Sequence, residues 1–314
     1  MQKIRIGIMV CTAQRPKMLE NCLHSLITQK ILPEWHVEIC VVENDSEPRS
    51  RETVDAVSAG TSIPIHYTQE ATRGIPYARN KTLRESLERG YHWIALIDDD
   101  EIALYNWLKT HMEAVDQFSA HVSYGAVQKN FEKQPPDWWY PEIPNHHPAG
   151  HSLPRASTNN VLFSARLISP PADLRFNPAY LYGYEDLDFF EAAYARKFKI
   201  VWTPGAIVEE EVPASRVEPT RLLNWSKSSS AAHVQVSILR KGYLRSALKF
   251  SIKGMRRLLG GAIGSAFFLV LAKFGSKKAV YRHYKSRMRL ARGLGNLQGV
   301  LQKPYRYYQV IDGQ

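Results

Sequence analysis

The sequence has no acidic residue between positions 219 and 311, although this stretch contains 19 Lys and Arg. The rest of the chain contains 22 basic and all 30 acidic residues, so the net charge of +11 comes from two parts of opposite sign. Two parts that differ so strongly in charge are expected to have different partners. We therefore predict one domain over residues 1–218 and a basic helical region over residues 219–314.

Cysteine is scarce, and the three cysteines, Cys11, Cys22 and Cys40, contain no CxxC pair. Their odd number argues against a disulfide framework and favours reduced core thiols in a cytoplasmic protein. The apolar run that follows Lys3 and Arg5 is too short for a signal peptide, so it fits a first strand better than an export signal. No GxGxxG or GxxxxGK[ST] motif follows this strand, which disfavours dinucleotide binding and a P-loop.

Strand and helix patterns alternate over the first 130 residues and predict a mostly parallel sheet covered by helices. The apolar runs predicted as strands cover residues 4–11, 37–43, 63–67, 93–97 and 122–127. The helical patterns between them cover residues 16–28, 76–89 and 102–118. A Pro-rich and aromatic segment, predicted to be a binding loop, is followed by a strand, a helix and two short strands. These occupy residues 132–155, 159–164, 186–197, 200–202 and 206–209.

Polar clusters follow the first, second and fourth predicted strands, where ligands of open α/β sheets bind. The fourth strand ends in Asp98, Asp99, Asp100 and Glu101. Carboxylates in such a place can bind Mg²⁺ or Mn²⁺, which then contacts a diphosphate. The alternative is a helix start, with Asp100 as N-cap and Glu101 in the first turn, although it gives Asp98 and Asp99 no role. Spacing alone favours neither reading.

Four short segments, in this order, resemble family-2 glycosyltransferases with the GT-A fold, and most of all bacterial exopolysaccharide glucosyltransferases of the succinoglycan type. The segments are Ile6-Gly-Ile-Met-Val-Cys-Thr-Ala-Gln-Arg-Pro, Val41-Val-Glu-Asn-Asp-Ser-Glu-Pro, Gly74-Ile-Pro-Tyr-Ala-Arg-Asn-Lys and Ile97-Asp-Asp-Asp-Glu. The resemblance implies a Rossmann-like, mostly parallel sheet. It also implies a nucleotide-sugar site that includes Cys11, Thr12, Glu43, Asp45, Arg79, Asn80, Asp98 and Asp99, with Asp100 on the metal.

Two later segments extend the resemblance to about residue 213. Ser157-Thr-Asn-Asn-Val-Leu-Phe is similar to an acceptor-side strand and implies acceptor contact by Asn160. Gly183-Tyr-Glu-Asp-Leu-Asp-Phe-Phe resembles the family's ED motif, which implies Glu185 near the acceptor and Asp186 as general base of an inverting reaction. The alternative for Asp186 is a helix cap. Relatives often carry a metal-binding His where this chain has Glu209, so Glu209 is a further candidate ligand.

The Pro-rich segment contains aromatic and histidine residues that can be read in two ways. Trp138 and Trp139 either stack on a sugar of the acceptor or anchor the loop, and the sequence favours neither role. His146, His147 and His151 have no Cys or well-spaced acid partner, so solvent-exposed histidines are favoured over a metal site.

The basic region begins with an amphipathic pattern over residues 244–259, whose polar face is entirely basic. The next segment, residues 258–272, is uncharged but has only 15 residues, so we predict an interfacial or re-entrant helix rather than a membrane crossing. Such a region suits an anionic cytoplasmic leaflet. The alternatives are packing on the acidic domain and nucleic-acid binding through Tyr305, Tyr307 and Tyr308, and we expect no nucleic acid.

Together these patterns predict an inverting, Mn²⁺- or Mg²⁺-dependent glycosyltransferase of cell-surface polysaccharide or glycan assembly. The predicted donor is a nucleotide hexose, with UDP as the expected nucleotide, and the predicted acceptor is a polyprenyl-diphosphate-linked saccharide. Residues 219–311 would attach the protein to the cytoplasmic face of the inner membrane, as a peripheral or monotopic membrane protein. Two alternatives are a catalytically silent adaptor that binds sugar or anionic lipid and a metal-dependent nucleotidyltransferase.

Overall fold

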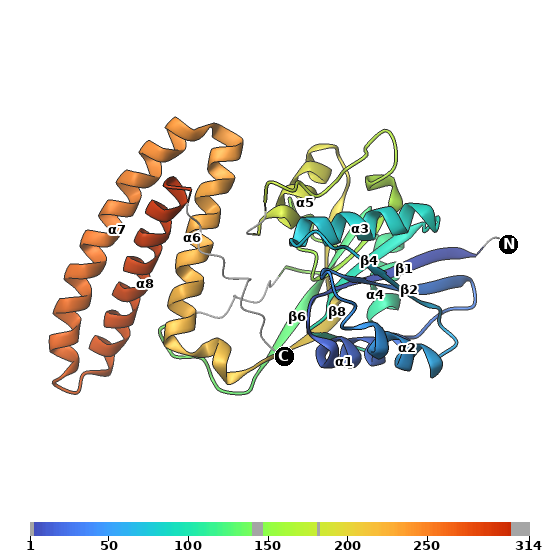
Figure 1. The fold of residues 1–314 in the computed structure, drawn as a ribbon, viewed down its shortest axis with the longest axis horizontal. Helices are drawn as coiled ribbons and strands as arrows, with labels where there is room; N and C mark the ends of the chain where they lie inside the picture. The colour runs from blue at the N-terminus through green and yellow to red at the C-terminus, as the bar shows by residue number, and fades with distance from the viewer. Residues whose placement is uncertain (1–2, 140–146, 181–182, 303–314) are drawn as a thin grey trace.

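The structure, a computed structural model, describes residues 3–139, 147–180 and 183–302. An eight-stranded sheet with helices on both faces forms one part, and three long helices form the other (Figure 1). The charge boundary near residue 219 therefore coincides with the start of the long helices.

The sheet has the order β3-β2-β1-β4-β7-β6-β8-β5 and is parallel from β3 to β4. Strands β7 and β5 run antiparallel to their neighbours, whereas β8 runs parallel to β6. The strands are β1 (Ile4–Thr12), β2 (Trp35–Glu43), β3 (Ile65–Gln69), β4 (Trp93–Asp98), β5 (Glu101–Ala103), β6 (Val122–Phe131), β7 (Asn160–Ser164) and β8 (Ile200–Val212).

Each face of the sheet buries its own apolar core because successive side chains of a strand point to opposite faces. On β1, Ile6, Ile8 and Val10 pack with one set of helices, whereas Met9 belongs to the core on the other face. The first set is α1 (Pro16–Ile27), α2 (Arg51–Ala59) and α4 (Trp107–Gln117). The second is α3 (Ile75–Glu88) and α5 (Glu185–Ala195). The two cores hold the carboxyl ends of β1, β2 and β4 at one edge.

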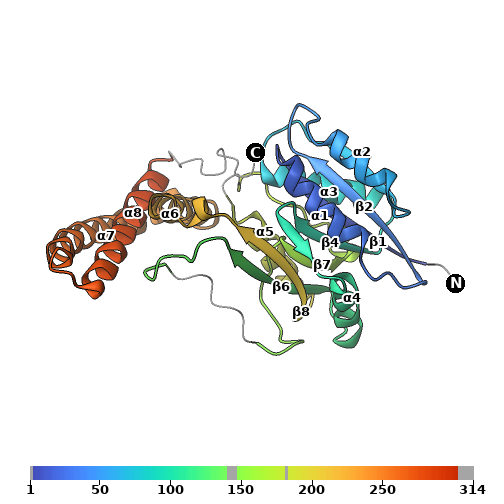
Figure 2. The same ribbon diagram turned by 90° about the horizontal axis from the view of Figure 1, so that it is seen from below.

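The C-terminal helices are α6 (Pro219–Lys241), α7 (Tyr243–Ala272) and α8 (Lys277–Val300), and they form a bundle beside the sheet (Figure 2). Small residues bring the helices close together. A Cβ atom on Gly261 would lie 2.7 Å from the backbone nitrogen of Leu290 in α8, and one on Gly295 would lie 2.0 Å from the carbonyl oxygen of Lys227 in α6. The basic region is therefore a tightly packed bundle.

Contacts from α5 and from the Pro-rich segment connect the bundle to the sheet domain. Arg240 of α6 forms ion pairs with Asp188 at 2.8 Å and Glu191 at 2.9 Å, both on α5. The indole ring of Trp138 stacks on Tyr284 of α8 with ring centroids 4.8 Å apart. The head of α5 consequently lies between the sheet and the bundle.

The α/β prediction is confirmed, but two element predictions are wrong. Residues 102–118 were expected to be one helix, whereas Glu101–Ala103 pairs with β8 and the helix begins at Trp107. The strands expected at 200–202 and 206–209 are a single strand. The amphipathic and apolar segments of the tail also join in the single helix α7. Two short 3₁₀ turns, η1 (Ala165–Leu167) and η2 (Ala214–Val217), follow β7 and β8.

Candidate functional site

The ends of β1 and β4 meet at the centre of the sheet and place the predicted donor residues side by side. Cys11 is the register partner of Asp98, and the hydroxyl of Thr12 donates a hydrogen bond to Asp99 at 2.7 Å. Burial raises the pKa of the Cys11 thiol to about 12, so this thiol is protonated at neutral pH. The structure thus brings together Cys11, Thr12 and the acidic cluster, as their positions at strand ends predict.

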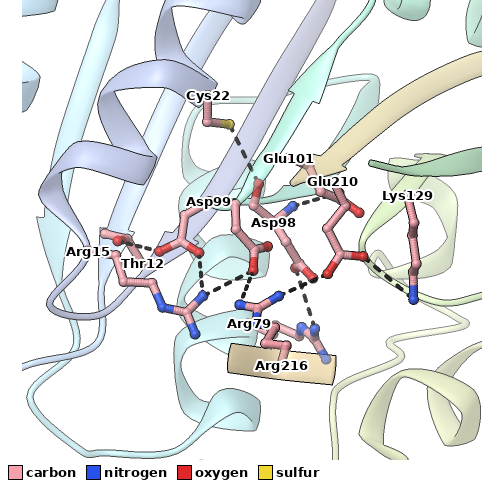
Figure 3. Close-up of polar contacts among 11 residues, drawn as sticks. Thr12, Arg15, Cys22, Arg79, Asp98, Asp99, Glu101, Lys129, Glu210 and Arg216 are labelled. Atoms are coloured by element: carbon pink, nitrogen blue, oxygen red, sulfur yellow. Dashed lines mark hydrogen bonds and ion pairs between the residues drawn. The ribbon is translucent and has the colours of Figure 1, made fainter. Parts of the chain in front are cut away.

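Three arginines, Arg15, Arg79 and Arg216, contact the acidic cluster from outside β4 (Figure 3). Arg15 lies 3.1 Å from Asp99 and 3.4 Å from Asp100. Arg216, in the turn after β8, lies 2.9 Å from Asp100 and 3.0 Å from Glu210. Asp100 therefore has a cationic partner on each side, and Arg216 links it to a carboxylate of β8.

Asp98, Asp99 and Glu101 hold their protons more tightly than ordinary carboxyl groups. Burial, followed by repulsion from Asp100 and Asp99, raises the pKa of Asp98 to about 7, although Arg79 opposes this rise. Burial raises the pKa of Asp99 to about 6, and burial together with the nearby Asp98 raises that of Glu101. The raised pKa values show that Arg15 and Arg79 do not fully offset the cost of burying Asp99 and Asp98.

This donor set fits a divalent cation. No three His, Cys, Asp or Glu side chains in the described part of the chain form a group able to hold a metal ion by themselves. However, Mg²⁺ and Mn²⁺ sites for diphosphates commonly use one or two carboxylates together with phosphate oxygens and water. Asp98 and Asp100 can supply these carboxylates, and a cation there would offset the cost of burying Asp98 and its repulsion by the neighbouring acids.

Arg79 of α3 connects the acidic cluster with the head of α5. Its guanidinium forms a short ion pair with the buried carboxylate of Glu185 and lies 3.9 Å from Asp98. The second carboxylate oxygen of Glu185, Oε2, is buried and has no hydrogen-bond partner among the described residues. Burial raises the pKa of Glu185 to about 6, against the influence of Arg79. A ligand with a donor group could satisfy this oxygen.

Asn80, the neighbour of Arg79, fixes the segment that leads into α5. Its amide nitrogen donates to the carbonyl of Phe176 at 2.7 Å, and its amide oxygen accepts from the nitrogen of Phe176 at 2.9 Å. Both ends of the side chain are thereby used for protein contacts. The structure gives Asn80 a positioning role beside the predicted donor site.

The three acids in the first turn of α5 have different environments. Glu185 is buried against Arg79, and Asp188 accepts hydrogen bonds from Tyr180 and Arg240. Asp186 is half-buried and has no ion pair within the part of the chain that the structure describes. It is one of the acids that raise the pKa of Asp98, after burial, Asp100 and Asp99. Asp186 is thus the acid of this turn that has a carboxylate available for a substrate.

At the end of β2, Glu43 and Asp45 are held by protein groups. Glu43 is fully buried and accepts hydrogen bonds from the backbone and hydroxyl of Ser50, each at 3.0 Å, and from Tyr67. Burial opposes ionisation of Asp45, but hydrogen bonds from Gln14 and the Glu47 backbone, with the charge of Arg73, lower its pKa. Their contact with a nucleotide stays a prediction.

Asn160, expected at the acceptor, lies in the core. Its amide oxygen accepts hydrogen bonds from the Trp107 indole at 2.7 Å and lies 2.9 Å from His111 Nε2. Its amide nitrogen donates to the carbonyls of Ala126 and Ala206. The residue is 0% exposed, so in this conformation it joins β6, β7, β8 and α4 rather than facing an acceptor.

The two tryptophans of the Pro-rich segment contact the helical bundle. Trp138 is 4% exposed in its stack on Tyr284, and Trp139 packs edge-on against Trp225 of α6 with ring centroids 5.2 Å apart. These positions favour anchoring of the loop, and sugar stacking by either residue stays a prediction. His147 and His151 stack on each other, and His146 lies outside the described residues.

Glu209, the candidate ligand of β8, points away from the Asp100 cluster. Glu210 contacts Arg216 and Lys129, and adjacent side chains of a strand project from opposite faces. Sequence reasoning missed Glu210, Arg15 and Arg216. The run of three glutamates on β8 indicates that a carboxylate lies near this edge. Which of the three lies there is known only from the pairing of Glu210 with Glu101.

The mixed sheet and the acidic strand end beside the head of α5 define a glycosyltransferase of the GT-A fold. A comparison with family models gives the same result, because the model described as Glycosyl transferase family 2 matches residues 7–169. The chain belongs to glycosyl transferase family 2.

One curated relative is a protein of succinoglycan biosynthesis. The chain is 26% identical over 263 residues to the succinoglycan biosynthesis protein ExoM of Rhizobium meliloti (strain 1021), a match that covers 81% of this chain and 82% of the relative. The resemblance to family-2 glycosyltransferases, including those of the succinoglycan type, is thereby confirmed.

Two solved structures show the same fold. Residues 1–349 of S. aureus TarS with UDP match at 17% identity and a TM-score of 0.54, covering 99% of this chain and 95% of that one. The mannosyltransferase PcManGT of Pyrobaculum calidifontis with GDP-Man and Mn²⁺ matches at 17% identity and a TM-score of 0.57, covering 96% and 88%.

Proposed function

We propose that this protein is an inverting glycosyltransferase that moves a hexose from a UDP-sugar to a lipid-linked saccharide in cell-surface polysaccharide assembly. The observation that carries the proposal is the placement of Asp186. This acid, which forms no ion pair among the described residues, stands at the head of α5, beside Arg79–Glu185 and near the acidic end of β4. Family membership and the ExoM relative supply the reaction class and the polysaccharide context.

The donor side of the site rests on the ends of β1 and β4. Thr12 and Arg15 fix Asp99, and Arg79 lies beside Asp98, so the polar edge is already ordered for a ligand with several oxygens. Asp100, with Asp98, would hold Mn²⁺ or Mg²⁺, which would stabilise the negative charge of the departing diphosphate. The complexes of the two structural neighbours with UDP and with GDP-Man and Mn²⁺ support a nucleotide-sugar donor.

The acceptor side needs one base, and Asp186 fits that task. The acceptor hydroxyl oxygen would form a bond to the anomeric carbon while the bond from that carbon to the diphosphate oxygen breaks. The hydroxyl proton passes to the Asp186 carboxylate, and the configuration at the anomeric carbon is inverted. Glu185 and Arg79 hold the first turn of α5 so that the carboxylate of Asp186 stays near the strand ends.

The surface of α7 supports the proposal of a lipid-linked acceptor. Eight apolar side chains, each between 51% and 84% exposed, are spaced three or four residues apart along the helix and form what we call the apolar stripe. They are Leu244, Leu248, Ile252, Met255, Leu259, Ile263, Phe267 and Val270. A stripe of this length, about 40 Å from Leu244 to Val270, beside basic side chains suits a helix lying in an anionic membrane surface.

The length of α7 would also permit it to cross a membrane. Among the described residues, α7 is the one helix that is long and apolar enough to do so. Only 6% of its most apolar window is buried in the protein. Its opposite side, however, packs against α8 along much of its length, as the close approach at Gly261 shows. An interfacial position keeps this packing, and with the cationic surface it supports attachment to the cytoplasmic face of the inner membrane.

Transfer of labelled sugar from a panel of UDP-sugars to membrane lipid, with Mn²⁺, tests the proposal. Asp186→Asn keeps the shape of the side chain but removes the base, so we expect a loss of transfer of roughly 100-fold or more with UDP binding retained. The control is Asp188→Asn in the same turn, which removes a contact to Arg240 and should retain most of the activity. Equal transfer rates for Asp186→Asn and the wild type would remove Asp186 as the base.

A further inference from the structure

A pocket of about 240 Å³ lies between the three helices of the bundle and the head of α5. Lys253 and Arg257 of α7 and Arg292 of α8 line it, with Ser226 of α6 and Asn296 of α8. Tyr184 closes the side toward α5. The pocket is therefore separate from the acidic strand ends, but it lies two residues from Asp186 along the chain.

The described residues that line the pocket carry positive charge and no negative charge. None of the residues that line it is Asp or Glu, and the helices α6 to α8 contain no acidic residue at all. Burial, and then the neighbouring cations, lower the pKa values of Lys253 and Arg257. Like charges held this close repel one another, which destabilises the bundle unless an anion binds between them.

Two buried polar side chains of the pocket lack partners. Ser226 and Asn296 are each 1% exposed, and neither Ser226 Oγ nor Asn296 Nδ2 has a hydrogen-bond partner among the described residues. The amide oxygen of Asn296 accepts a hydrogen bond from Arg257 at 3.4 Å, so its amide nitrogen is directed away from that cation as a free donor. Buried donors in native proteins are nearly always paired, so these atoms indicate a ligand that accepts hydrogen bonds.

We propose that this pocket binds the diphosphate group of an isoprenyl-linked saccharide acceptor, an inference that rests on the proposed function. Three cations and neutral donors, with no acid among the lining residues, match an anion that carries several negative charges and many acceptor oxygens. The helix that supplies Lys253 and Arg257 also carries the apolar stripe, which can hold the isoprenyl chain. On the side of the pocket toward α5, the lining residue Tyr184 is two residues from Asp186. The saccharide end of the acceptor would therefore reach the proposed base.

Calorimetric titration of the full-length protein in detergent with farnesyl diphosphate tests this proposal, with farnesol as the uncharged probe. We expect saturable binding of farnesyl diphosphate and none of farnesol. Loss of one charge-assisted contact in Arg257→Gln or Arg292→Gln should weaken binding roughly tenfold or more. The matched control is Arg256→Gln, because Arg256 is exposed on α7 and does not line the pocket.

Thermal unfolding separates a binding defect from a folding defect. Removing one cation from a repelling cluster should leave the unfolding temperature of Arg257→Gln unchanged or raised, and Arg257→Lys should keep most of the affinity. An Arg257→Gln protein that is folded and binds farnesyl diphosphate as tightly as the wild type would overturn the proposal. Inorganic diphosphate that binds as tightly as farnesyl diphosphate, or phosphatidylglycerol vesicles that compete as well, would overturn the isoprenyl-linked source.

A parallel titration with UDP and Mn²⁺ distinguishes this proposal from the proposed function. Arg257→Gln should bind UDP as the wild type does, because the acidic strand ends are untouched. If the wild type transfers no sugar but its farnesyl diphosphate binding depends on Arg257, the transferase proposal fails and the pocket stands. If sugar is transferred and Arg257→Gln has full affinity, the pocket proposal fails alone.

Discussion

The sheet domain and the helical bundle differ in whether their charged side chains have partners of the opposite sign. In the sheet domain, several acids of the site have partners of the opposite sign, as Asp99 has Arg15, Asp100 has Arg216 and Glu185 has Arg79. In the bundle, Lys253, Arg257 and Arg292 face one pocket without an acid. Ion pairs inside a protein hold the side chains of a site in place. Like charges that have no counter-charge instead require a ligand of the opposite sign. The difference indicates that the two regions bind two different ligands.

The largest expected effect concerns the apolar stripe of α7. Replacing Leu248, Ile252 and Leu259 with Gln removes three exposed apolar side chains, each of which contributes roughly 1.5–3 kcal/mol when buried in lipid. Binding to phosphatidylglycerol vesicles, measured by flotation, should fall by more than about 100-fold. The sheet domain should keep its UDP affinity.

The control for the stripe is Leu87→Gln on α3, where the side chain is 37% exposed. This change has the same chemistry but lies outside the bundle, so vesicle binding should be unaffected. Flotation of the triple variant at the wild-type level would show that α7 does not contact the membrane.

A smaller effect, in the free energy of unfolding, concerns the sheet domain. Burial lowers the pKa of His111 to about 4, and its ring bonds with Ser123 and Asn160 in the core. The unfolded chain takes up this proton near pH 6.5 and the folded protein only near pH 4, so stability falls as the pH falls between these values. The loss reaches about 3 kcal/mol near pH 4.

The comparison of wild type with His111→Gln isolates this contribution from the titrating acids. Acids with raised pKa values, such as Asp99, make the folded protein more stable as the pH falls over part of this range, which is the opposite of the effect of His111. Chemical denaturation at a series of pH values should give a difference in unfolding free energy that narrows as the pH falls from 6.5 to 4. A difference that does not change with pH would exclude a neutral buried His111.

Much of the fold follows from local patterns in the sequence. The apolar runs that end in Thr12, Glu43 and Asp98 identify β1, β2 and β4, and their polar ends predict one ligand-binding edge. Local patterns failed for residues 102–118, because the three-residue strand at Glu101–Ala103 exists only through its pairing with β8. Pairing between distant segments cannot be read from the periodicity of either one.

The same reason limits prediction of the site. Arg15, Glu210 and Arg216 are distant in sequence from Asp100. The turns after β1 and β8 bring in the two arginines, and the pairing of β8 with β5 brings in Glu210. Asn160 stands in a motif that points to the acceptor, but its strand lies between β4 and β6, where its amide joins core groups. Residue types predicted the chemistry at the sheet edge, whereas contacts across the sheet decided which side chains reach it.

The separation of the two ligand sites is tested most directly by calorimetric titration of Asp100→Asn with UDP in the presence of Mn²⁺. Loss of one carboxylate ligand should weaken UDP binding by roughly tenfold or more, with farnesyl diphosphate affinity unchanged. A folded Asp100→Asn protein that binds UDP with wild-type affinity in Mn²⁺ would contradict the account.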